Sequence, residues 1–329
     1  MLVHAAGRVA ALAVPPRRLL QFAFFGGGAI AAPLFFFAAG WSACRWQSHA
    51  GGGQLMQAVL RRALAAVGWS ALICSPLLAS QPARRAFLEV LPVLGLLVLL
   101  SLAALTLRRF RFVDAVGTLL SPLVGRPGGL ILLSLPTAAI LFMTNWHALR
   151  PATSLLVDYP LLIIYTTWFA AGWWIGSSPA LFDKLTRRWR FRLILAFLLS
   201  FVLYGAHLRY NAAGLIEGPR RMLFCLTYVM FTWRAILALA GAYRVGRLRV
   251  PNKLLRPAEA LFCCYCIHRP WIAWFEQKLV RPEVPVPLQF LAISAGTLAI
   301  AWAGYELVVR RTPLRAWLAW GPTAGPFPG

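Results

Sequence analysis

Long apolar stretches recur along the chain, and short connections that hold most of the basic residues separate them. Each stretch is about as long as a helix that crosses the hydrocarbon core of a bilayer, which takes roughly 17–25 residues. None alternates apolar and polar residues as a barrel strand does, and a backbone in hydrocarbon must pair its own polar groups, so the pattern predicts helices. The nine predicted spans are residues 19–43, 63–80, 88–107, 129–147, 159–178, 192–208, 222–242, 258–280 and 288–309. The expected fold class is all-α, a polytopic transmembrane helix bundle.

Composition supports a membrane protein. Of the 329 residues, 60% are hydrophobic and 13% are charged, whereas a soluble domain has roughly 25% charged residues. These values exclude a soluble enzyme. A net charge of +24 would suggest a nucleic-acid partner in a soluble protein, but here the basic residues lie in the connections, where they orient the helices. We therefore expect membrane lipid, and no nucleic acid, as a partner.

The distribution of Lys and Arg also predicts an orientation. Alternate connections form two sets, and the set that contains residues 184–192, 244–256 and 310–315 carries about twice as many basic residues as the other set. Because connections rich in basic residues stay in the cytoplasm, we expect the C-terminus there and the protein in a bacterial-type inner membrane. The same assignment places the start of the chain outside. Residues 1–14 read as the end of a helix, so we expect one further helix upstream of Met1.

No internal repeat or long linker divides the chain, so residues 1–320 are expected to form one integral membrane domain, with the Gly- and Pro-rich residues 321–329 as a disordered tail. The six cysteines lie in or at the edge of apolar helices, so we expect buried thiols and no metal site. The chain carries no P-loop, no Gly-x-Ser-x-Gly elbow and no His-Glu-x-x-His motif. Any chemistry must use polar residues inside the membrane.

Ionisable residues inside a membrane are costly, so each is a candidate functional residue. They are His268 and Arg269 near the middle of span 258–280, Arg234 in span 222–242, Glu306 near the end of the last span, and Asn145 and His147 near the end of span 129–147. With His4 and His207, most histidines fall toward the outer face, which suggests an outward-facing polar vestibule. A lone buried histidine usually joins two helices by a hydrogen bond. We favour a functional role for His268 and His4 and a structural one for His147 and His207.

Three segments resemble one membrane-protein family. Tyr265-Cys266-Ile267-His268-Arg269-Pro270 is similar to the Tyr-x-x-His-x-Pro pattern in a late helix of the acyltransferase family 3 proteins. Residues 33–40, Pro-Leu-Phe-Phe-Phe-Ala-Ala-Gly, resemble the family's early Pro-x-Phe-Phe-x-x-Ser-Gly helix, although Ala39 replaces the usual Ser. Residues 305–313 resemble its closing segment. Order and spacing agree over residues 1–320, most closely with the branch that adds succinyl groups to periplasmic glucans.

The resemblance implies a membrane-bound O-acyltransferase. Such an enzyme moves an acetyl or succinyl group from a cytoplasmic acyl-CoA, its co-substrate, to a hydroxyl of an extracytoplasmic glycan or lipid-linked sugar, and it holds no bound cofactor. Residues 2–6 resemble the end of the family's first helix, whose Arg would lie upstream of Met1. His4 is therefore the expected general base, because a histidine with a pKa near about 6.5 can take a hydroxyl proton.

The remaining site residues are assigned around that reaction. His268 is expected to steady the acceptor or to exchange protons with it, and Arg269 to pair with a CoA phosphate, with Glu306 or with a backbone carbonyl. Further substrate-binding candidates are Tyr265, Glu306, His147 and Asn145. The dense basic cluster Arg187, Arg188 and Arg190 is a candidate site for the nucleotide end of CoA, or it serves only to orient the helices.

Two other classes of protein are compatible with the same residues. A transporter or flippase of a glycolipid or anionic lipid would use an outward vestibule and intramembrane His and Arg for binding without bond chemistry. A structural subunit of an envelope-polysaccharide complex would need no first-helix Arg. Turnover of acyl-CoA separates the enzyme from both.

Overall fold

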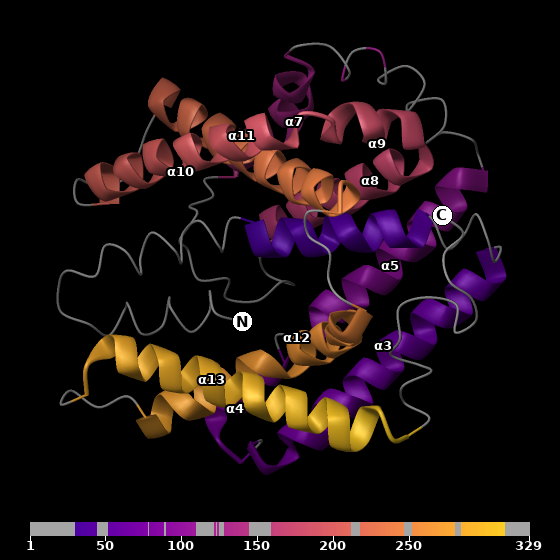
Figure 1. The fold of residues 1–329 in the computed structure, drawn as a ribbon, viewed down its shortest axis with the longest axis vertical. Helices are drawn as coiled ribbons and strands as arrows, with labels where there is room; N and C mark the ends of the chain where they lie inside the picture. Colours follow the sequence, from indigo (N-terminus) through magenta and orange to yellow (C-terminus); the bar gives the residue numbers. More distant parts are fainter. Residues whose placement is uncertain are drawn as a thin grey trace. The chain divides into compact units, whose positions relative to one another are not determined.

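The structure is a computed structural model, and its regular elements are helices (Figure 1). It describes residues 30–44, 52–77, 79–88, 90–109, 122, 124, 128–144, 159–211, 218–246, 252–279 and 284–312. The all-α prediction is confirmed for these residues. His4, Asn145 and His147 lie outside them, so their predicted roles stay predictions.

The chain divides into two compact units. Unit 1 comprises Met1–Phe24, Gly52–Val98 and Val250–Gly329, and unit 2 comprises Phe25–Gly51 and Leu99–Arg249. Helix α5 (Val90–Arg109) passes from one unit to the other. The prediction of a single membrane domain over residues 1–320 stays a prediction.

Unit 1 carries His268 and Glu306. Its helices are α3 (Gly52–Cys74), η1 (Ser75–Leu77), α4 (Gln81–Leu88), α12 (Asn252–Leu279), α13 (Val286–Gly304) and the π-helical turn η2 (Tyr305–Val309). Helix α12 packs against α3, α4 and α13. Large rings fill the space over glycines: a Cβ at Gly304 would lie 2.9 Å from the Trp69 ring, and one at Gly296 would lie 2.7 Å from the Phe275 ring. These contacts hold α3 and α12 close to α13.

Unit 2 is built around α11. It contains the helix Ile30–Cys44, α7 (Gly129–Met143), α8 (Tyr159–Ser177), α9 (Pro179–Thr186), α10 (Trp189–Asn211) and α11 (Gly218–Arg244). Helix α11 packs against α7, α9 and α10 (Figure 1). Ala196 and Leu203 of α10 and Phe231 and Ala235 of α11 form a buried cluster, so α10 and α11 share an apolar interface.

The helix Ile30–Cys44 and α8 approach each other through glycines. A Cβ at Gly172 would lie 2.0 Å from the carbonyl oxygen of Phe37, and a Cβ at Gly40 would lie 2.0 Å from that of Phe169. No side chain fits at either position. Small residues at helix interfaces are typical of membrane bundles, where packing replaces the hydrophobic effect as the force that joins helices.

Four helical stretches are long and apolar enough to cross a membrane: Gln81–Ala103, Trp189–Ala206, Gly218–Arg244 and Leu288–Val309. They correspond to the predicted spans 88–107, 192–208, 222–242 and 288–309. Two shorter apolar helices, Ile30–Cys44 and Gly129–Met143, overlap the predicted spans 19–43 and 129–147. The described residues thus support a multi-pass membrane protein, and the full set of nine spans stays a prediction.

Helix α3 differs from the predicted span 63–80. It begins at Gly52 and ends at Cys74, and Ser75–Leu77 form a 3₁₀ turn. The first turns of α3 were not predicted, because they contain the polar residues Gln54, Arg61 and Arg62 and a hydropathy pattern detects only the apolar part of a helix. Pro76, which has no N–H to donate, favours its end.

Candidate functional site

Helix α12 places His268 in the interior of unit 1. The His268 side chain is 3% exposed, and its neighbours Cys266 and Ile267 are fully buried. Arg269 is half-buried. Both His268 and Arg269 have interaction partners within the protein. His268 therefore lies buried within a helix, while the predicted membrane span 258–280 and the role of His268 stay predictions.

An aromatic cluster follows His268 along α12. The ring centroids of Trp271 and Trp274 are 5.7 Å apart, and those of Trp274 and Phe275 are 5.2 Å apart. The indole Nε1 of Trp271 is buried and has no hydrogen-bond acceptor among the described residues. Trp271 lies three residues after His268, so both project from the same side of α12. Trp271 was not predicted from the sequence, because a tryptophan in a helix shows no sign of whether its N–H finds an acceptor.

Glu306 lies in the π-helical turn that follows α13. The backbone N–H of Arg310 donates to the carbonyl of Tyr305 over 2.8 Å, which is the spacing of a π turn. The Glu306 carboxylate bonds the Arg310 guanidinium, and this hydrogen bond and charge raise the pKa of Arg310. The structure therefore shows Arg310 as a partner of Glu306, a pair that was not predicted, and the predicted substrate-binding role of Glu306 stays a prediction. The Tyr265 side chain is outside the described set.

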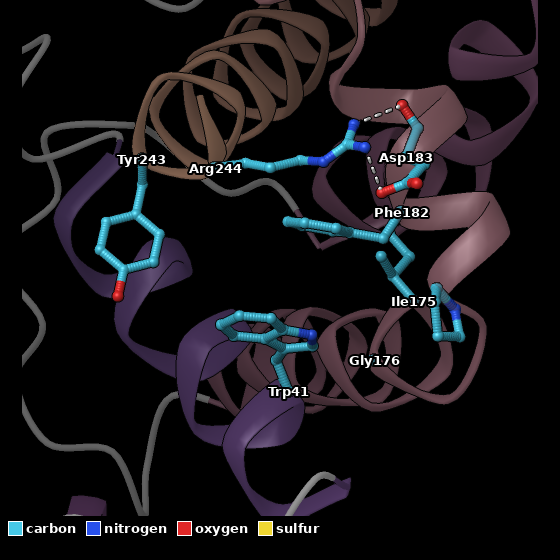
Figure 2. A pocket seen from close by; sticks show the side chains of 8 residues that line it. Trp41, Ile175, Gly176, Phe182, Asp183, Tyr243 and Arg244 are labelled. Atoms are coloured by element: carbon cyan, nitrogen blue, oxygen red, sulfur yellow. Dashed lines mark hydrogen bonds and ion pairs between the residues drawn. The ribbon is translucent and has the colours of Figure 1, made fainter. Parts of the chain in front are cut away.

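Unit 2 contains a pocket at one end of the bundle. Its volume is about 230 Å³, and residues of the helix Ile30–Cys44, α8, α9 and α11 line it (Figure 2). The lining residues are Trp41, Ile175, Gly176, Pro179, Phe182, Asp183, Tyr243 and Arg244.

Aromatic rings and one ion pair shape this pocket. The Trp41 ring stacks on Phe182 with centroids 5.4 Å apart and an interplanar angle of 20°. Gly176 makes room for Trp41, because a Cβ there would lie 2.5 Å from Cδ1 of the indole. The Arg244 guanidinium bonds the Asp183 carboxylate at 2.9 Å and reaches its backbone carbonyl at 3.5 Å (Figure 2). Both charged side chains stay partly exposed at the rim, so solvent screens their attraction.

The predicted CoA-binding arginines lie at the same end of unit 2. Arg187, Arg188 and Arg190 are exposed where α9 meets α10, and the Arg190 guanidinium lies 5.5 Å from the centroid of the Trp189 ring. A Cβ at Gly241 would lie 2.7 Å from the carbonyl oxygen of Thr186, so the end of α11 touches this junction. The structure therefore brings the basic cluster and the pocket to one end of the bundle.

The pocket residues Trp41, Phe182 and Tyr243 were not predicted from the sequence. In the sequence they are recognisable only as aromatic residues close to the ends of predicted spans, next to connections assigned to the same side of the membrane. Aromatic residues collect at span ends in most membrane proteins, so only tertiary contacts distinguish a pocket from an interfacial belt.

The two regions differ in chemistry. The α12 region offers a buried imidazole and an indole N–H, whereas the end of unit 2 offers aromatic faces and several guanidinium groups. Among the described residues, no group of three or more His, Cys, Asp or Glu side chains is placed to hold a metal ion.

Comparisons with known proteins identify the family. Comparison with curated proteins and with solved structures found no match. The acyltransferase 3 family model, described as an acyltransferase domain, matches residues 1–306. This match does not separate the branches of the family, so the likeness to the glucan-succinylating branch stays a prediction. Because the match covers most of the chain, including α12 and its Tyr-x-x-His-x-Pro segment, the chain belongs to the acyltransferase 3 family and is a membrane acyltransferase.

Proposed function

We propose that the protein transfers an acetyl or succinyl group from acyl-CoA to a hydroxyl of an extracytoplasmic glycan or lipid-linked sugar. The observation that carries the proposal is the pairing on α12 of a buried imidazole, His268, with the buried indole N–H of Trp271, in a member of an acyltransferase family. Family membership favours this activity over a transporter or a structural subunit.

The α12 groups supply what acyl transfer to a hydroxyl needs. A histidine takes the proton of the acceptor hydroxyl, and the hydroxyl oxygen attacks the thioester carbonyl of acyl-CoA. The carbon–sulfur bond then breaks, and the CoA thiolate leaves and is protonated. His268 is suited to exchange that proton or to orient the hydroxyl, and His4, by family resemblance, is the general base. The N–H of Trp271 is suited to donate to an oxygen of the acceptor or of the acyl group, where charge develops during attack.

The basic end of unit 2 suits the donor. CoA carries phosphates and an adenine ring, and guanidinium groups bind phosphate in a bidentate manner. Arg187, Arg188 and Arg190 provide guanidinium groups, and the rings of Trp41, Phe182 and Tyr243 provide faces on which a base can stack. We assign this end to the cytoplasmic side of an inner membrane, with the C-terminus also cytoplasmic, because its connections are those in the more basic set.

The proposal is tested with purified protein, radiolabelled acetyl-CoA or succinyl-CoA, and membrane glycans. Wild-type protein is expected to move label to the glycan and release CoA. His268→Ala is expected to lower kcat by about 10²- to 10⁴-fold, the usual contribution of a general acid or base. Trp271→Phe keeps an aromatic ring and removes the indole N–H, so it is expected to lower kcat without raising KM for acyl-CoA. Arg187→Gln combined with Arg188→Gln is expected to raise that KM instead.

His207→Ala is the matched control, since it removes a histidine of α10 to which we assign a structural role and no part in the reaction. Thermal unfolding of each variant separates lost chemistry from lost structure. If folded wild-type protein releases no CoA with any acceptor, the assignment of acyl-CoA as the donor is wrong. If folded His268→Ala retains wild-type turnover, the assignment of the site to α12 is wrong.

A further inference from the structure

Two arginines meet inside unit 2, away from the pocket described above. Arg192 lies in the first turn of α10, and Arg234 lies within α11, which packs along α10. The Arg192 guanidinium is close enough to those of Arg234 and Arg188 for their charges to repel it. Like charges brought together at a helix interface raise the free energy of the folded protein unless an anion neutralises them.

These two arginines lack acceptors within the described part of the chain. Both side chains are half-buried, and the Nε atoms of both are fully buried with no hydrogen-bond partner there. Asp183 is the one carboxylate of unit 2 in the described ranges, and it is bonded to Arg244. Buried donors are nearly always satisfied, so two such donors on neighbouring cations point to an acceptor that the described residues do not supply.

The chemistry of that acceptor follows from the donors. A guanidinium presents a planar fork of N–H groups that matches the oxygens of a phosphate. A phosphate can reach this place from either of two directions. Arg188, exposed at the neighbouring helix junction, faces the solvent, whereas Phe191 and Ile194, which flank Arg192 on α10, are exposed apolar side chains of a membrane helix.

We propose that Arg192 and Arg234 form a binding site between α10 and α11 for a phosphate-type anion, either a phosphate group of CoA or the headgroup phosphate of an anionic lipid. Basic pockets between transmembrane helices on the cytoplasmic side bind lipid head groups in other membrane proteins, and Arg192 lies in the first turn of α10, next to the basic junction with α9. It does not depend on the proposed acyl transfer, because binding of the anion requires neither an acceptor glycan nor turnover.

The test measures thermal unfolding and binding of the full chain in nanodiscs made only of phosphatidylcholine. One arm adds CoA, with pantetheine as the analogue without phosphates, and the other incorporates phosphatidylglycerol. We expect at least one arm to raise the unfolding temperature of the wild type, because a ligand that binds only the folded state stabilises it. Arg192→Gln and Arg234→Gln are each expected to weaken that binding by about 10- to 100-fold, the loss of a charge-assisted hydrogen bond.

Arg220→Gln is the matched control, since Arg220 is exposed at the opposite end of α11; it is expected to bind as the wild type does. Arg192→Lys keeps the charge and loses the fork, so intermediate binding is expected. A response to phosphatidylglycerol alone identifies a lipid site, and a response to CoA but not to pantetheine identifies a CoA phosphate. If neither arm affects the wild type, or if the two Gln variants bind as well as it does, the proposal is wrong. It is also wrong if the Gln variants unfold without any ligand, because each arginine would then neutralise a group of the chain itself.

Discussion

At the scale of single residues, glycines set the distance between the helix Ile30–Cys44 and α8. The positions where a Cβ would overlap a backbone carbonyl, at Gly40 and Gly172, leave the two helices in direct backbone contact. The Phe36 and Tyr165 rings stack beside this contact with centroids 4.4 Å apart. The two glycines and the ring stack therefore position the helix Ile30–Cys44 against α8.

Gly172→Ala is expected to destabilise the protein. The added methyl group would lie 2.0 Å from the Phe37 carbonyl oxygen, and overpacking of this kind costs about 1–3 kcal/mol. Thermal unfolding in detergent measures the effect. Gly205→Ala in α10 is the control, because nothing lies within 4 Å of its Cβ position. Replacing a glycine inside a helix by alanine stabilises a protein by up to about 1 kcal/mol. Equal stability of the two variants would contradict the close approach.

Single residues also differ in whether their environment could be predicted from the sequence. His268 stands out in the sequence because an ionisable residue in an apolar run is unusual, and the structure buries it in α12. Cys44, Cys74, Cys225 and Cys266 are buried as predicted. Arg234 also stands out as an ionisable residue in an apolar run, but Trp271 and the association of Arg234 with Arg192 could not be predicted in this way, because what marks these residues is a buried N–H with no acceptor among the described residues. That property belongs to the neighbours and not to the residue.

At the scale of elements, α10 presents a broad apolar surface. In the stretch Trp189–Ala206 only 17% of residues are buried, and the exposed side chains include Leu193, Phe197, Leu198 and Phe201. A soluble protein would bury such a surface, since large exposed apolar patches drive association. In a membrane protein the lipid covers it.

Leu198→Asp is therefore expected to impair insertion of α10. A carboxylate near the centre of a membrane helix costs about 3 kcal/mol during insertion, and Leu198 is 54% exposed. An insertion assay with engineered glycosylation sites on both sides of α10 measures the fraction that spans. Ser200→Ala is the control, because the Ser200 hydroxyl bonds the carbonyl of Phe197 within the same helix. Normal insertion of the Asp variant would mean that α10 does not face lipid.

Element boundaries were the least predictable feature. Apolar runs locate the middle of a helix, but α3 extends well before its run and α12 (Asn252–Leu279) begins before the predicted residue 258. Likewise, the apolar residues of Tyr305–Val309 continue the pattern of α13, yet the chain forms a π turn there. Hydropathy reports the environment of side chains and not the hydrogen-bond spacing of the backbone.

At the scale of the molecule, the arrangement of helix ends within unit 2 follows the alternation expected of successive spans. The Arg221 guanidinium donates to the carbonyl of Phe142 over 2.9 Å, which joins the start of α11 to the end of α7. The opposite end of α11 meets α9 and the start of α10 through Gly241. Two of the basic connections that were assigned to one side of the membrane, at the α9–α10 junction and at the end of α11, therefore lie together.

Labelling of single cysteines tests this arrangement. Arg187→Cys and Val245→Cys are expected to react with a membrane-impermeant maleimide from one and the same side, because both positions are exposed at the basic end. Arg220→Cys is expected to react only from the other side. The positive-inside bias predicts that the first two react from the cytoplasm. Labelling of positions 187 and 245 from opposite sides would contradict the antiparallel order of α10 and α11.

From its sequence alone the chain is recognisable as a helical membrane protein with alternating basic connections and the motifs of an acyltransferase, and His268 is predicted to take part in its chemistry. These properties depend on local composition and on short motifs, which need no knowledge of what lies opposite. Tertiary contacts alone show that Trp41, Phe182 and Arg244 line a pocket, and that Arg192 and Arg234 lie near each other with buried Nε atoms that have no acceptor among the described residues. Such features arise where separate helices meet, and contacts between distant segments leave almost no trace in the order of residues along one chain.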